Sequence, residues 1–161
     1  MLDQVWQALA ATGYGVVSAL VPIFNAEAYA AVAGAAGSWP TALVAVLGLA
    51  LGQTTGKLII YEAAGRGGKW WGQRFARGAE KERDGSKGRR WWDRAVVELA
   101  RPRTATPLLV AAGVAGVPPL AMLALAAGVA GTNRVLFVAV CFAGRAVRFG
   151  LCAFGVGVWF D

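Results

Sequence analysis

Glu27 is the only charged residue between Gln4 and Gly56. An uncharged stretch of this length is typical of segments that lie in a lipid bilayer, where about 20 apolar residues cross the hydrocarbon. A charged side chain at the centre of a bilayer costs about 2.5–3.5 kcal/mol on insertion scales. Because ionisable residues at that depth are usually retained for a function, we interpret Glu27 as a candidate site residue.

The composition also favours a membrane location. Hydrophobic residues make up 57% of the chain and charged residues 16%, whereas soluble domains carry about 25% charged residues. The mean hydropathy is +0.52. The 22 glycines supply small residues of the kind that let helix backbones approach closely in lipid. We predict an all-α integral membrane protein in which residues 1–161 form a single membrane domain.

The positive charge is confined to one segment. Residues 66–103 contain 12 of the 16 Lys and Arg and five of the nine Asp and Glu, which accounts for the whole net charge of +7. Basic loops between apolar segments mark the cytoplasmic side of a membrane, so we expect a cytoplasmic loop over residues 66–103. Its tryptophan pairs, Trp70-Trp71 and Trp91-Trp92, indicate contact with an anionic leaflet rather than with nucleic acid.

Four apolar blocks flank this basic segment, at about residues 5–37, 40–65, 107–131 and 135–160. The second and fourth blocks are long enough to span a bilayer. The first and third contain helix breakers, with Pro22 and Asn25 in one and Pro118 and Pro119 in the other. Broken backbone survives in a membrane where it faces protein or water, so each block could form a re-entrant helical hairpin with these residues at its tip. Two kinked spanning helices are the alternative.

The two halves of the chain resemble each other. Gly34–Gly37 in the first half parallels Gly128–Gly131 in the second, and a broken apolar segment precedes a span in both. One hairpin and one span per half would make the second half start from the opposite side of the membrane. We therefore predict an inverted repeat of two re-entrant hairpins, each followed by a transmembrane helix, in halves 1–65 and 104–161.

Three charged residues inside the apolar blocks are candidates for chemistry. Asn25 can cap a helix that begins beside it, which would place Glu27 in the first turn. There Glu27 either is favoured by the helix dipole or faces a wet cavity and exchanges protons. Arg145 and Arg148 share a helix face near the midplane. They require an acid such as Glu27 or a phosphate headgroup, unless they reach the surface by snorkelling.

Other residue patterns have structural interpretations. Gly48, Gly52 and Gly56 recur every four residues and predict a stripe for helix packing. Cys141 and Cys152 would lie roughly 16 Å apart along a helix, too far for a disulfide. The chain has no histidine, and no acids or cysteines have metal-ligand spacing. We therefore expect no metal, no cofactor and no enzymatic activity.

Groups of residues in three parts of the chain carry a family resemblance: Pro22-Ile23-Phe24-Asn25-Ala26-Glu27; Gly52, Gly56, Tyr61 and Gly65-Arg66-Gly67-Gly68; and Ala127-Gly128, Phe137, Gly144-Arg145 and Arg148-Phe149. In this order they resemble the first hairpin, the glycine-rich span, and the second hairpin with the last span of the DedA family. That family is also called the VTT or SNARE-associated Golgi protein domain. The resemblance covers most of residues 14–157.

The resemblance implies a multi-pass protein of the bacterial inner membrane. It implies flippase-like or scramblase movement of a lipid with a phosphate headgroup, a phospholipid or a polyprenyl phosphate, linked to protons. By position, Glu27 is similar to the family's membrane-embedded acid and Arg145 to one of its essential arginines, with Arg148 a candidate for another. Many members carry a second acid where this chain has Gln53, which weakens the expectation of strict proton coupling.

The partners expected from these arguments are membrane lipids with anionic headgroups, and protons. Copies of the chain could also associate into a homo-oligomer. Two other functions fit the sequence. One is a small efflux protein for cationic compounds, in which Glu27 would bind cation and proton in turn. The other is a non-transporting scaffold that recruits a partner through the basic segment.

Overall fold

The computed structural model describes residues 2–21, 25–36, 38–80, 93–115 and 119–157, and every regular element in these ranges is α-helical. The helices are α1 (Leu2–Leu20), α2 (Ala26–Ala36), α3 (Trp39–Glu80), α5 (Pro102–Ala115), α6 (Leu120–Ala130) and α7 (Arg134–Gly157). Residues 93–99 form a further helical segment. The prediction of an all-α fold is confirmed for the described residues.

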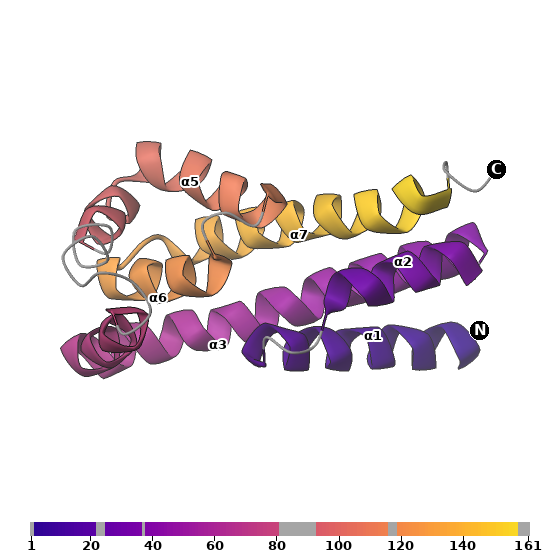
Figure 1. The fold of residues 1–161 in the computed structure, drawn as a ribbon, viewed down its shortest axis with the longest axis horizontal. Helices are drawn as coiled ribbons and strands as arrows, with labels where there is room; N and C mark the ends of the chain where they lie inside the picture. The colour runs from indigo at the N-terminus through magenta and orange to yellow at the C-terminus, as the bar shows by residue number, and fades with distance from the viewer. Residues whose placement is uncertain (1, 22–24, 37, 81–92, 116–118, 158–161) are drawn as a thin grey trace.

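The chain reverses direction after α1 and again after α5 (Figure 1). Helix α2 runs back toward the end of the molecule at which α3 begins, and α6 runs back toward the opposite end, where α7 begins. Helices α3 and α7 run in opposite directions along the molecule. The C-terminal ends of α1 and α5 therefore both lie beside the middle parts of the two long helices.

The glycine stripe of α3 lies against α1. A Cβ atom at Gly52 would overlap the carbonyl oxygen of Thr12, and one at Gly56 would come within 2.5 Å of the Cβ atom of Ala19. A Cβ atom at Gly48 would lie 2.9 Å from the Cβ atom of Ala11. The predicted role of this stripe in helix packing is confirmed, since the two backbones approach too closely for larger side chains.

The short helices form two pairs, α1–α2 and α5–α6. The second helix of each pair packs against the long helix of the other half, α2 against α7 and α6 against α3. In α2, a Cβ atom at Gly34 would overlap the carbonyl oxygen of Ala153 in α7. In α6, one at Gly128 would overlap the carbonyl oxygen of Tyr61 in α3. The two halves interlock through these crossings, so the matched glycines seen in the sequence make corresponding contacts.

Two buried clusters fill the space between the helices. One includes Leu109, Leu123 and Phe137 from α5, α6 and α7, and the ring of Phe137 stacks on Tyr61 with centroids 4.9 Å apart. The other includes Leu49 and Phe149 from α3 and α7. The clusters place α3 and α7 at the centre of the molecule.

Large apolar side chains also cover the outer faces of the helices. The most exposed are Trp6, Val32, Trp39, Val135 and Leu151, each between 65% and 76% exposed. Soluble monomers seldom display so much apolar surface without a partner. The outside of the molecule is therefore suited to an apolar environment.

Two stretches are long and apolar enough to cross a membrane, as judged by length and composition. They are Trp39–Gly67, with 29 residues, and Arg134–Gly155, with 22 residues. Helix α3 has 42 residues and is about 63 Å long at 1.5 Å per residue, roughly twice the thickness of bilayer hydrocarbon. Only its first part is apolar.

The described parts of the basic segment 66–103 are largely helical. Helix α3 continues to Glu80, residues 93–99 are helical, and α5 begins at Pro102. Arg, Lys, Gln and Glu are good helix formers. The charged residues from Arg66 onward therefore continue the helix, although they do not suit the interior of a bilayer. The pair Trp91-Trp92 lies outside the described residues.

Candidate functional site

Glu27 is held at the start of α2 by an asparagine cap. The Oδ1 atom of Asn25 accepts hydrogen bonds from the backbone N–H groups of Glu27, at 3.0 Å, and Ala28, at 3.3 Å. Asparagine is among the best N-cap residues because its side chain satisfies N–H groups that have no partner within the helix. The predicted cap is confirmed, and Glu27 lies in the first turn, where the helix dipole favours a carboxylate.

Arg148 forms an ion pair with Glu27 across the two halves. Its Nη2 atom lies 2.5 Å from Oε1 of Glu27, and its Nε–H donates to the same oxygen at 2.8 Å. Its Nη1 donates to the carbonyl oxygen of Val114 at 3.1 Å. Val114 lies in the last turn of α5, whose carbonyl groups lack helical partners and attract cations. One guanidinium thus connects α2, α5 and α7.

The ion pair is only partly enclosed by protein. The side chain of Arg148 is 24% exposed and that of Glu27 is 40% exposed. The carboxylate is therefore partly accessible from outside the helix body. This property distinguishes the pair from a sealed structural ion pair.

Arg145 lies one turn before Arg148 on α7, but its guanidinium is not paired in the same way. Its Nε atom is buried and has no hydrogen-bond partner. Among the residues that the structure describes, no carboxylate lies within ion-pair distance of it. A buried charged donor without a partner is costly, and such groups commonly mark a missing ligand, ion or water.

Lys57 is a third cation at this place, and it was not among the predicted site residues. It is 6% exposed, and its Nζ donates to the carbonyl oxygen of Ala19 at 2.7 Å. Ala19 lies in the last turn of α1. Lys57 therefore donates to a C-terminal carbonyl group of α1, as Arg148 does to one of α5. The available signal was its position directly after Gly56, which places it beside the helix face that contacts α1.

Gln53 lies one turn before Lys57, within the contact between α1 and α3. Its Nε2 donates to Oγ of Ser18 at 2.9 Å, and that hydroxyl donates to the carbonyl oxygen of Gly15 at 2.9 Å. The Oε1 atom of Gln53 is buried without a partner. A polar path therefore continues from Lys57 along the inner face of α1.

The four charged side chains belong to one electrostatic cluster. Arg145 lies one helical turn before Arg148, which pairs with Glu27, and Lys57 lies on α3, which packs against α7. In the described part of the chain this cluster contains three cations and a single carboxylate. Its excess positive charge in an apolar helical body favours the binding of an anion.

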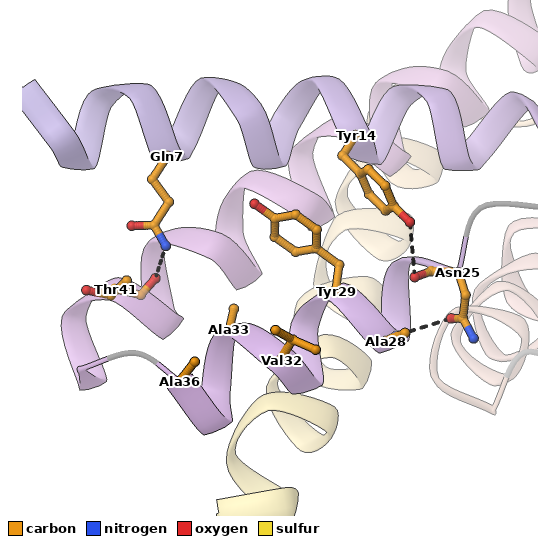
Figure 2. Close-up of a pocket in the computed structure, with 9 residues that line it drawn as sticks. All are labelled: Gln7, Tyr14, Asn25, Ala28, Tyr29, Val32, Ala33, Ala36 and Thr41. Atoms are coloured by element: carbon orange, nitrogen blue, oxygen red, sulfur yellow. Dashed lines mark hydrogen bonds between the residues drawn. The ribbon is translucent and has the colours of Figure 1, made fainter.

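A groove of about 590 Å³ lies between α1, α2 and the start of α3. Figure 2 shows the side chains of Val32 and Ala33 along one wall and the tyrosines toward the end at Asn25. The rings of Tyr14 and Tyr29 stack with centroids 5.0 Å apart. The lining is mainly apolar, and Asn25 at its end is two residues from Glu27.

The other residues singled out in the sequence are the prolines of the interrupted segments and the two cysteines. Pro119 directly precedes α6, the place that Asn25 has before α2. Pro22 and Pro118 lie outside the described residues. Cys141 and Cys152 are free thiols, in agreement with the prediction that they do not form a disulfide.

Among the described residues, no three side chains of His, Cys, Asp or Glu come together as a metal site. Comparisons of the chain with protein-family models, with curated proteins and with solved structures find no match.

Proposed function

We propose that this chain is a small membrane transporter that moves or scrambles a lipid with a phosphate headgroup. The observation that carries the proposal is the cationic cluster of Lys57, Arg145 and Arg148 around the single acid Glu27. Ionisable groups within apolar helical bundles usually belong to a substrate or ion pathway. Guanidinium groups bind phosphate oxygens in a bidentate geometry, which makes phosphate the best-matched ligand.

Insertion in a membrane is supported by the two apolar stretches, Trp39–Gly67 and Arg134–Gly155, and by the apolar outer faces. In this arrangement the two stretches span the bilayer, and the pairs α1–α2 and α5–α6 are re-entrant hairpins that enter from opposite sides. This is the plan of an inverted-topology repeat with its site at the midplane.

The resemblance to the DedA family implies the same plan and a place in the bacterial inner membrane. The basic segment 66–103 then faces the cytoplasm, following the distribution of Lys and Arg around membrane spans. Its helical first part would carry positive charge out from the membrane surface, where anionic headgroups attract it.

Glu27 supplies a link to protons in this mechanism. Protonation of its carboxylate would remove the charge that holds Arg148, and would loosen the contact between α2, α5 and α7. The headgroup phosphate would bind to the unpaired guanidinium of Arg145.

The direct test is movement of a fluorescent phospholipid between the leaflets of proteoliposomes that contain the purified protein. We expect Glu27→Gln and Arg145→Ala each to slow this movement at least tenfold. The control is Arg134→Gln, because Arg134 is on the same helix but is 64% exposed and pairs with Glu62 at the surface. Movement at the wild-type rate in both site variants would contradict the mechanism.

A small efflux protein for cationic compounds is the second candidate function. It is favoured by the stacked pair Tyr14–Tyr29 in the groove, since aromatic faces bind organic cations. The excess of positive charge at the cluster opposes it. Export of a basic dye that is abolished in Glu27→Gln, together with unchanged lipid movement, would favour efflux over lipid transport.

A further inference from the structure

The charge of Arg148 is already balanced within the protein. Its Nε and Nη2 atoms contact the carboxylate of Glu27, and its Nη1 donates to the carbonyl oxygen of Val114. Two of its five N–H donors remain, but Glu27 neutralises the guanidinium. This side chain holds α2 and α5 in place, and an anion bound nearby needs cations that have no counter-ion.

Arg145 is the first of these partners. Its buried Nε–H has no acceptor, although the neighbouring Arg148 on the same face has three contacts. Leaving a buried charged donor unsatisfied carries the full desolvation penalty of the group. An oxyanion between α7 and α3 would satisfy it.

Lys57 is the second partner. Its bond to Ala19 uses one of the three donors of the ammonium group, which leaves two. The carbonyl of Ala19 is neutral, so the charge of a side chain that is only 6% exposed is not balanced by it. Tyr61 of α3 stacks on Phe137 of α7, and Leu49 of α3 shares a buried cluster with Phe149 of α7. Because the two helices run in opposite directions, Lys57 lies between these contacts at the level of the α7 turn that precedes Arg145, which places the two cations across the same helix contact.

We propose that Lys57 and Arg145 together bind one phosphate-type oxyanion, and that Arg148 is a positioning residue that holds α2 and α5 around it. The inference rests on the proposed function in taking a phosphate group as the ligand. It adds Lys57 as a binding residue supplied by the first half of the chain, so that each half contributes one cation to the ligand.

The test is binding of short-chain lipids to the purified full-length protein in a nonionic detergent. Dioctanoyl phosphatidic acid is the probe, and dioctanoylglycerol is the matched ligand without phosphate. We expect Lys57→Met to weaken binding of phosphatidic acid about tenfold or more, as for a lost charged hydrogen bond. Lys57→Arg keeps the charge and should retain binding, as should the surface control Arg134→Gln.

Circular dichroism and gel filtration establish whether each variant is folded. A folded Lys57→Met protein that binds phosphatidic acid as tightly as the wild type would overturn the inference. If Lys57→Met does not fold, Arg145→Gln decides, because unchanged binding in that variant also overturns a site shared by the two cations. Equal affinity of the wild type for phosphatidic acid and dioctanoylglycerol would do the same.

A further arm replaces the lipid with inorganic phosphate. Phosphate that competes with phosphatidic acid at equal concentration identifies the free anion as a sufficient ligand, and weak competition identifies the lipid headgroup; both results support the shared oxyanion site. Lys57-dependent binding without lipid movement in proteoliposomes would reject the proposed function and keep the site. A folded Lys57→Met protein that keeps both the binding of phosphatidic acid and normal lipid movement would keep the function and reject the site.

Discussion

The middle of α3 and the middle of α7 each carry a cation that binds the C-terminal end of a neighbouring helix, but only one of these cations has a counter-ion. Lys57 of α3 donates to the end of α1, and Arg148 of α7 donates to the end of α5. Arg148 also pairs with Glu27, the second residue of α2. The second residue of α6 is Ala121, so α6 offers no carboxylate at the corresponding place.

This difference separates architecture from chemistry. In each half, the long helix binds the C-terminal end of the first short helix. In each half, a glycine of the second short helix packs against the long helix of the other half. Only the cation of α7 is neutralised, by Glu27 of the first half. The uncompensated charge of Lys57 and Arg145 then remains available to a ligand, whereas Arg148 is occupied.

The largest effect is expected from filling the two crossings. Gly34→Leu and Gly128→Leu each force a side chain into a backbone carbonyl of the other half, and we expect each to destabilise the protein by about 3 kcal/mol or more. Thermal unfolding in detergent measures this. The control is Gly150→Ala, since a Cβ atom there meets nothing within 4 Å. Tolerance of leucine at only one of the two positions would show that the crossings are not equivalent.

A smaller effect is expected when the ion pair is broken. Glu27→Gln leaves Arg148 without its counter-ion, and we expect a loss of about 1–3 kcal/mol, less than for a sealed pair because Glu27 is 40% exposed. Chemical denaturation compares this variant with Glu62→Gln, which breaks contacts to the exposed Arg66 and Arg134 and should cost about 0–1 kcal/mol. Equal losses in the two variants would argue against a structural role for the Glu27–Arg148 pair.

The smallest change in stability is expected from giving Lys57 the counter-ion it lacks. Gln53→Glu places a carboxylate one turn before Lys57, and we expect the gain from this ion pair to be offset by burial of the new charge and by loss of the hydrogen bond to Ser18. It should also neutralise Lys57 and weaken binding of phosphatidic acid, whereas Gln53→Leu should leave that binding in place. Titration of the probe against both variants measures the difference. Stronger binding in Gln53→Glu would contradict the proposed role of Lys57.

Much of the local structure could be predicted from the sequence. Helix breakers place the interruptions between α1 and α2 and between α5 and α6, Asn25 predicts the start of α2, and the glycine stripe at Gly48, Gly52 and Gly56 predicts a close helix contact. These features act over a few residues, where propensity and spacing are informative. The apolar block ends near residue 65, but α3 continues to Glu80, because the length of an apolar block bounds a membrane span and not the helix that contains it.

The partners of the charged residues could not be predicted in the same way. Arg145 and Arg148 are equivalent in the sequence, and either could have paired with Glu27. The choice depends on the rotation of α7 against α2, across a separation of 121 residues. The place of Lys57 in the site could not be predicted either, because it depends on a hydrogen bond to Ala19, 38 residues away in the sequence.

The sequence by itself determined an apolar, all-helical chain with two interrupted segments and a few charges too costly to be incidental. Those properties follow from composition and local spacing, which every conformation of the chain shares. The tertiary structure alone decided that Arg148 is neutralised and that Arg145 and Lys57 are not. The reason is physical: the energy of a charge in an apolar interior depends on which groups lie within a few ångströms of it, and packing sets those distances.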